Sequence, residues 1–232
     1  MSVLRERLEA AFPSLLDELT QLVAIPSVSS DPAHAADLER SAEHLRERFE
    51  ALGLAAKVLR ETAADGTEGK PAVVAHTPHI EGAPTVLLYA HHDVQPVGDP
   101  AGWNQADPFT AERRGERLFG RGTSDDKAGV ITHTHALRTL TSLTDGELPC
   151  SVTVFIEGEE EIGSPTMPTL LDRYRDELAA DVYIVADSVN WEVGKPSLTT
   201  SLRGVADCQV TVSTLAEGLH SGQFGGVVPD AL

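Results

Sequence analysis

The sequence predicts an α/β protein in which a doubly wound, largely parallel sheet is flanked by helices and is followed by the start of a smaller domain. Three apolar runs, at residues 85–90, 151–156 and 181–186, carry this prediction, and we expect them to be inner strands of the sheet. They lack the strict alternation of a half-exposed sheet, so we expect helices on both faces. Helical patterns lie between consecutive runs, which is the order of right-handed βαβ units.

The N-terminal part is predicted to be helical. Apolar residues recur at steps of three and four between residues 4 and 22, with a break where Pro13 can begin a second helix. Asp31, followed by a proline, predicts the start of another helix, which ends at Gly53. We interpret the apolar faces of these helices as packing surfaces.

The remaining elements are predicted in order along the chain. Residues 55–61 and 71–77 resemble two antiparallel strands joined by a turn, and residues 125–140 and 166–180 carry amphipathic helical patterns. Residues 201–214 alternate apolar and polar side chains, as expected for a strand of a half-exposed antiparallel sheet. We therefore predict one domain over residues 1–196 and the incomplete beginning of a second over residues 197–232.

The composition argues against several classes of partner. The 232 residues include 36 Asp and Glu against 18 Lys and Arg, a formal net charge of −18. This field repels phosphate groups, so neither nucleic acid nor an anionic membrane is an expected partner. No run approaches the roughly 18 apolar residues of a membrane span, and no signal-peptide pattern is present, which makes the cytoplasm the default location.

Candidate metal ligands follow each of the three apolar runs and also occupy a glycine-flanked loop before a predicted helix. They are His91, His92 and Asp93; Asp125 and Asp126; Glu157, Glu159, Glu160 and Glu161; and Asp187. Ligands of open α/β sheets bind beyond the carboxyl ends of the strands, so these groups are expected at one edge. Consecutive glutamates raise the cost of ionising one another, which cations lying among them would offset.

The mixture of side chains indicates the kind of cation. Imidazole combined with carboxylates suits zinc, manganese or cobalt better than calcium or magnesium, which favour all-oxygen shells. His91 and Asp93 point to the same side of an extended backbone, so Asp93 can accept the second ring N–H of His91. Of Glu160 and Glu161, one can bind metal while the other takes a proton from the attacking water.

Taken together, these residues resemble a family of dinuclear metal-dependent exopeptidases and deacylases. The family includes carnosinase-type dipeptidases, aminoacylase, glutamate-releasing carboxypeptidases and succinyl-diaminopimelate desuccinylase. The resemblance rests on the segments YAHHDVQP, GW, DPF, LFGRGTSDDKAG, EGEEEIGS, ADS and GLHSGQFGG. Among the branches of the family, HHDVQPVGD and GRGTSDDKAG are most similar to the dipeptidases.

The resemblance implies a site with two divalent metal ions, with zinc expected and manganese or cobalt as alternatives. It implies that His91 and Asp187 bind one ion, that Asp125 bridges both, and that Glu161 binds the other. It also implies a cis peptide bond after the bridging aspartate.

The resemblance also implies the catalytic roles. It assigns Asp93 to orienting the histidine ligand and Glu160 to acting as general base and later as general acid. It makes residues 197–232 the start of a small α+β lid and dimerisation domain. Through this domain a homodimer forms, and His220 reaches into the partner subunit's active site to polarise the scissile carbonyl.

The function that follows is a metal-dependent hydrolase that cleaves the amide bond of dipeptides or short peptides. An N-acyl amino acid deacylase or desuccinylase, and a non-catalytic metal-binding dimerisation fragment, are the alternatives. The family's remaining terminal ligand is a histidine near the C-terminus of a longer chain, and this sequence ends before any such residue. We therefore expect a truncated chain that binds metal incompletely and hydrolyses substrates poorly or not at all.

Overall fold

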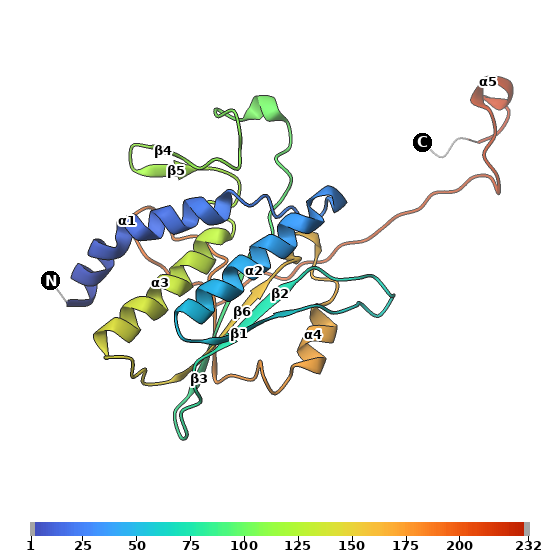
Figure 1. The fold of residues 1–232 in the computed structure, drawn as a ribbon. Coiled ribbons are helices and arrows are strands. Elements are labelled where there is room, and N and C mark those ends of the chain that lie inside the picture. Colours follow the sequence, from blue (N-terminus) through green and yellow to red (C-terminus); the bar gives the residue numbers. More distant parts are fainter. Residues whose placement is uncertain (1–2, 230–232) are drawn as a thin grey trace. The chain divides into compact units, whose positions relative to one another are not determined.

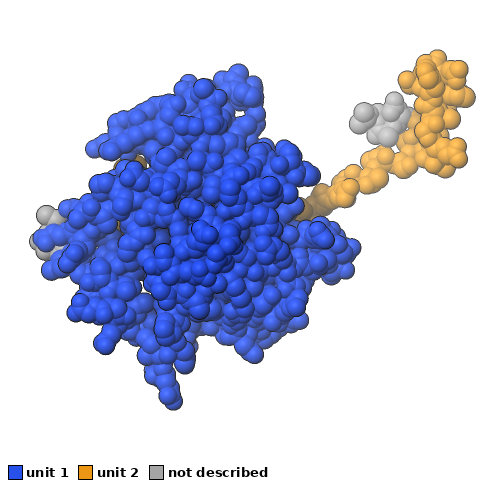
Figure 2. Space-filling view, viewed as in Figure 1, with its two compact units in different colours: residues 1–189 blue, residues 190–232 orange. Residues whose placement is uncertain are grey.

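A computed structural model describes residues 3–229 of the chain. The chain divides into two compact units, residues 1–189 and residues 190–232 (Figure 2). The first unit contains the sheet and its covering helices, and the described part of the second contains one short helix, α5 (Ser221–Phe224).

A five-stranded sheet forms the centre of the first unit. Its strands lie in the order β1-β2-β6-β3-β7. Their bounds are β1 (Ala55–Leu59), β2 (Ala72–His76), β3 (Thr85–His91), β6 (Ser151–Glu157) and β7 (Val182–Val185). Strand β3 pairs in parallel with β6 and β7, whereas β2 is antiparallel to β1 and β6. Only β2 is therefore reversed, and the predicted largely parallel sheet is confirmed.

Helices cover both faces of this sheet (Figure 1). Three lie on one face and one on the other: α1 (Val3–Val23), α2 (Ala35–Ala51) and α3 (Lys127–Leu143), opposite α4 (Met167–Arg173). The larger core, which includes Leu22, Leu45 and Val130, joins the first three helices to the sheet. The smaller core joins Leu170 of α4 to Phe155 of β6.

Shorter elements complete the described residues. They are the 3-10 helices η1 (Pro32–His34), η2 (Pro100–Gly102) and η3 (Glu160–Ile162) and the hairpin strands β4 (Glu112–Arg114) and β5 (Arg117–Phe119). The capping predicted for the second helical region is present, because the Asp31 side chain accepts a hydrogen bond from the Ala33 N–H. Gly53, at φ +85°, follows α2. Of the helices in the described residues, none is both long and apolar enough to cross a membrane.

Helix α1 differs from the prediction in two respects. It continues through Pro13 as one helix, so the predicted break is wrong. Its apolar stripe is buried only towards the C-terminal end, at residues such as Leu19 and Leu22, whereas Leu4 and Phe12 are exposed. The packing that stabilises most helices in proteins therefore acts on the second half of α1.

Two predicted strands also differ. Strand β7 was expected inside the sheet, but within the described residues it pairs only with β3 and forms an edge, with all four of its residues exposed. Residues 201–214, expected to form a strand, are exposed and contain no strand. An isolated alternating segment has no neighbouring backbone to complete its ladder hydrogen bonds, so the pattern alone does not form a strand.

Candidate metal centre

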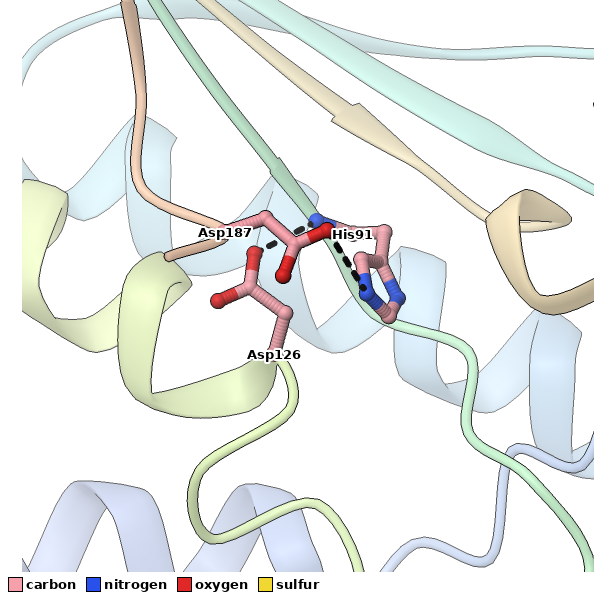
Figure 3. A group of neighbouring side chains, drawn as sticks. All are labelled: His91, Asp126 and Asp187. Atoms are coloured by element: carbon pink, nitrogen blue, oxygen red, sulfur yellow. Dashed lines mark hydrogen bonds and ion pairs between the residues drawn. The ribbon is translucent and has the colours of Figure 1, made fainter. Parts of the chain in front are cut away.

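The carboxyl edge of the parallel strands brings the predicted ligands together. His91 is the last residue of β3 and pairs with Glu157, the last residue of β6. Asp187 follows β7 by two residues, and Asp126 immediately precedes α3 on the same side of the sheet (Figure 3). Four segments that are distant in sequence therefore contribute to one site, as the position of these residues after the strands predicted.

One group of potential ligands consists of His91, Asp126 and Asp187, whose ligand atoms all lie within 4.8 Å of one another. Asp126 Oδ2 accepts a hydrogen bond from the backbone N–H of His91 at 3.1 Å. Asp187 Oδ2 is 3.8 Å from His91 Nε2. Figure 3 shows both carboxylates beside the imidazole at the end of β3.

A second group shares the same histidine. His91, Asp125 and Glu161 also place their ligand atoms within 4.8 Å of one another, and Asp125 Oδ1 is 3.1 Å from His91 Nε2. The peptide bond between Asp125 and Asp126 is cis, as the resemblance implied. The three predicted carboxylate ligands, Asp125, Glu161 and Asp187, therefore lie around the imidazole of the fourth, His91, and Asp126 joins the group that contains Asp187.

Asp93 fixes both the imidazole and the acidic loop. Nδ1 of His91 is 3.0 Å from the backbone oxygen of Asp93 and 3.3 Å from its Oδ1. Both oxygens are acceptors, so Nδ1 carries the hydrogen in the neutral ring and Nε2 is free to meet a cation. The Asp93 carboxylate also accepts the backbone N–H groups of Glu160 and Glu161, each at 3.2 Å.

The carboxylates create a strongly negative environment. Burial alone would lower the pKa of His91, but the hydrogen bond to Asp93 and the charges of Asp93, Asp126 and Glu160 raise it to about 10. Burial is the main cause that raises the pKa of Asp126 to about 7. Oδ1 of Asp126 is buried and has no hydrogen-bond partner. Imidazole, clustered carboxylates and an unpartnered buried oxygen form a donor set that fits a divalent cation.

Glu160 has the environment of a proton acceptor. Its Oε2 is 3.8 Å from His91 Nε2, and its side chain is partly exposed. Burial raises the pKa of Glu160; His91 opposes the shift, while Asp187 and Glu161 add to it. A carboxylate whose pKa is raised holds an abstracted proton more readily than an ordinary one.

Two of the candidate ligands named from the sequence were given no individual role there, and the structure distinguishes them. Asp126 received no role, although its position beside Asp125 at the start of a helix was a usable signal. Glu159 was grouped with the acidic residues but is buried and turned away from the cluster. It accepts hydrogen bonds from the Lys70 N–H at 3.0 Å and from Thr166 N–H at 2.6 Å.

His220 is the one predicted site residue outside the first unit. It is exposed and precedes α5, where its Nδ1 accepts a hydrogen bond from the Gly222 N–H at 3.1 Å. The structure describes this histidine within its own unit, so its assignment to the carbonyl remains a prediction.

The fold and the cluster define a class of protein: an α/β domain with a histidine–carboxylate cation site at the carboxyl edge of its sheet. Residues 87–220 match the model of Peptidase family M20/M25/M40. This match covers more than half of the chain, and the chain belongs to that family. Membership implies divalent metal ions.

Individual relatives agree with this result. The chain is 37% identical over 218 residues to a cysteinylglycine-S-conjugate dipeptidase of Corynebacterium striatum, covering 94% of this chain and 46% of the relative. It is 32% identical over 241 residues to a Cys-Gly metallodipeptidase of Candida albicans, covering 98% and 49%. Human carnosine dipeptidase 1 superposes with a TM-score of 0.78 at 25% identity, covering 97% and 48%. The chain spans about half the length of the curated relatives it matches.

Proposed function

We propose that the protein is a metal-dependent dipeptidase that hydrolyses the amide bond of dipeptides or short peptides. The observation that carries the proposal is the convergence of His91, Asp125, Glu161 and Asp187 beside Glu160 at one edge of the sheet. A purely structural cation site has no need of a partly exposed glutamate with a raised pKa.

The proposed site holds two divalent ions, with zinc first and manganese or cobalt as alternatives. His91 and Asp187 would hold one ion, Glu161 would hold the other, and Asp125 would be a ligand shared by both. When bound, such ions polarise an amide carbonyl and lower the pKa of water.

The catalytic roles belong to the protein's own side chains. Glu160 takes a proton from the attacking water and returns it to the leaving amine. Asp93 holds the His91 ring in the tautomer that leaves Nε2 available. His220, supplied by a partner subunit through a lid and dimerisation domain beginning near residue 197, polarises the scissile carbonyl.

The proposed substrate class is the dipeptides, supported by the names of the relatives, which specify Cys-Gly and carnosine dipeptidases. N-acyl amino acids are the competing substrates, because a deacylase can share the same site. Cys150 and Cys208 are both free thiols, which supports a reducing, cytoplasmic location.

A substrate panel tests this proposal. The protein is stripped with a chelator and reloaded with zinc, manganese or cobalt, and hydrolysis of Cys-Gly and β-Ala-His is compared with that of N-acetyl and N-succinyl amino acids. Preference for the dipeptides supports the dipeptidase. Preference for the acylated amino acids replaces it with the deacylase. Because this chain is expected to be truncated and spans about half the length of its relatives, metal binding without hydrolysis supports the non-catalytic alternative only when a protein of the relatives' full length is inactive as well.

Substitution of the base gives a sharper test. Glu160→Gln should lower kcat by about 100-fold or more, because the amide cannot accept the proton. Zinc affinity, measured by calorimetry, should change little, since this residue is not a proposed ligand. Equal kcat in the two proteins would remove Glu160 from the mechanism.

A further inference from the structure

Gln95 makes a two-point contact with one of the proposed ligands. Its amide Nε2 donates to the Glu161 carboxylate at 2.8 Å and to the Glu161 backbone oxygen at 3.1 Å. Gln95 lies two residues after Asp93, which itself binds the backbone N–H groups of Glu160 and Glu161. Side chains two residues apart on an extended backbone share one side, so His91, Asp93 and Gln95 can all act on the same site.

The hydrogen bond from Gln95 orients the Glu161 side chain, whose carboxylate has few other contacts. Within residues 3–229, no other residue donates a hydrogen bond to the Glu161 carboxylate. A glutamate side chain has three rotatable bonds, and ordering it costs conformational entropy that the amide contact partly offsets. With Oε2 engaged by Gln95, the other carboxylate oxygen remains available to a cation.

We propose that Gln95 is a positioning residue that holds Glu161 in the orientation that binds metal. This inference rests on the proposed function. A neutral amide suits the task, because it donates a hydrogen bond without cancelling the negative charge that attracts the cation. A lysine would neutralise the carboxylate and a second carboxylate would repel it.

The proposal predicts an effect confined to one side of the site. Gln95 contacts Glu161, which belongs to the group with His91 and Asp125. It has no hydrogen bond to Asp126 or Asp187, the partners of His91 in the other group. Removing the amide should therefore weaken one binding event and spare the other.

The test is a titration of the metal-free chain with cobalt(II), followed by calorimetry and by the visible absorption of the bound ion. Gln95→Met removes the donor while keeping a side chain of similar length. Gln105→Met is the control: Gln105 is half-buried, its Nε2 donates to two backbone oxygens, those of Asp107 at 3.1 Å and Thr110 at 2.8 Å, and its Oε1 accepts from Arg114 at 3.5 Å. Glu161→Gln identifies the binding event that depends on Glu161.

We expect Gln95→Met to weaken the event identified by Glu161→Gln about tenfold or more, as loss of a residue that orients a ligand does elsewhere. The other event, and the Tm of the metal-free protein, should match those of Gln105→Met. Equal affinities in the two methionine variants would overturn the role of Gln95 while leaving the proposed function intact. Equal weakening of both events, with a lowered Tm, would also overturn it by showing general destabilisation.

Two further outcomes separate this inference from the function on which it rests. If the unmodified chain binds no cobalt, the proposed metal site fails and the role of Gln95 fails with it. If Glu161→Gln binds cobalt as the unmodified chain does, Glu161 is not a ligand and Gln95 has nothing to position.

Discussion

The three glutamates that follow β6 occupy three different environments. Glu159 is buried among donors from Lys70 and Thr166. Glu160 is partly exposed beside His91, and Glu161 accepts a hydrogen bond from the side-chain amide of Gln95. Like charges can lie next to one another here because each carboxylate has its own compensating groups. One glutamate anchors the loop, and the other two face the candidate site.

The anchoring role of Glu159 predicts a loss of stability. In Glu159→Gln, one carboxylate oxygen becomes an NH₂ group that would face a backbone N–H, which leaves buried donors unpaired. We expect the free energy of unfolding to fall by about 1–3 kcal/mol, measured by urea denaturation. Glu81→Gln, on an exposed loop, is the control and should change it by less than about 0.5 kcal/mol. Equal effects in the two variants would contradict the anchoring role.

At the scale of elements, the end of α1 and the segment that follows it form hydrogen bonds to two segments next to the candidate site, the start of α3 and the residues after β3. The buried ammonium of Lys127, the first residue of α3, donates to the Leu22 oxygen at 3.0 Å and to the Ile25 oxygen at 2.6 Å. Ser27 Oγ donates to the His92 oxygen at 2.6 Å. A cation at the carbonyl end of a helix is also favoured by the helix dipole. The end of α1 thereby fixes the backbone on either side of the cluster.

Glu18 links the three helices that cover this face of the sheet. From α1 it accepts hydrogen bonds from Arg48 of α2 and from Arg138 of α3, the latter at 2.6 Å. Burial would raise the pKa of Glu18, but the hydrogen bond from Arg138 and the charges of Arg48 and Arg138 lower it. The folded protein therefore binds a proton at this carboxylate less readily than the unfolded chain does.

This linkage predicts both a mutational and a pH effect. Glu18→Gln should lower the free energy of unfolding by about 1–2 kcal/mol near pH 7, because two arginines lose their anion. The stabilisation is complete above the ordinary glutamate pKa of 4.5 and is lost as the pH falls below it. The free energy of unfolding of the variant, which lacks this carboxylate, should therefore fall less steeply with decreasing pH than that of the unmodified protein. Glu9→Gln breaks an exposed ion pair with Arg5 on the same helix. This control should lower the free energy of unfolding by less than about 0.5 kcal/mol. Identical acid profiles for Glu18→Gln and the unmodified protein would contradict this account.

The elements that could be predicted from sequence are those specified by local pattern. The periodicity of α2, the cap of η1 at Asp31 that precedes it, and the apolar runs of β3 and β6 needed no knowledge of distant residues. The edge position of β7 and the absence of a strand at residues 201–214 depend on which backbone lies alongside, which a local pattern does not contain. The same limit applies to the site: its location followed from the strand ends, but the different surroundings of the three glutamates depend on distant donors such as Thr166 and Gln95.

At the scale of the whole molecule, an excess of negative charge acts against the compact state. The formal net charge is −18, and several of the carboxylates that contribute to it lie within a few ångströms of one another in the candidate site. Bound cations would relieve this local repulsion, and added salt screens the repulsion between exposed charges. Specific binding and general screening therefore both raise stability, and an experiment has to separate them.

Thermal unfolding with zinc and with calcium at equal concentrations makes that separation. Calcium screens charge but favours an all-oxygen shell, whereas the histidine-containing cluster suits zinc. At 100 times its Kd, zinc should add about 2.7 kcal/mol. That corresponds to a rise in Tm of roughly 5–10 °C for a chain of this size, and a chelator should reverse it.

Matched variants attribute the rise to the cluster. Asp125→Asn and Asp187→Asn should each reduce the rise in Tm caused by zinc, because each removes a carboxylate from one group around His91. Asp172→Asn removes the same charge from a side chain that is 82% exposed, so it should retain the full rise. If zinc and calcium raise Tm equally, or if all three variants respond alike, the stabilisation is screening of the acidic surface and the cluster is not a metal site.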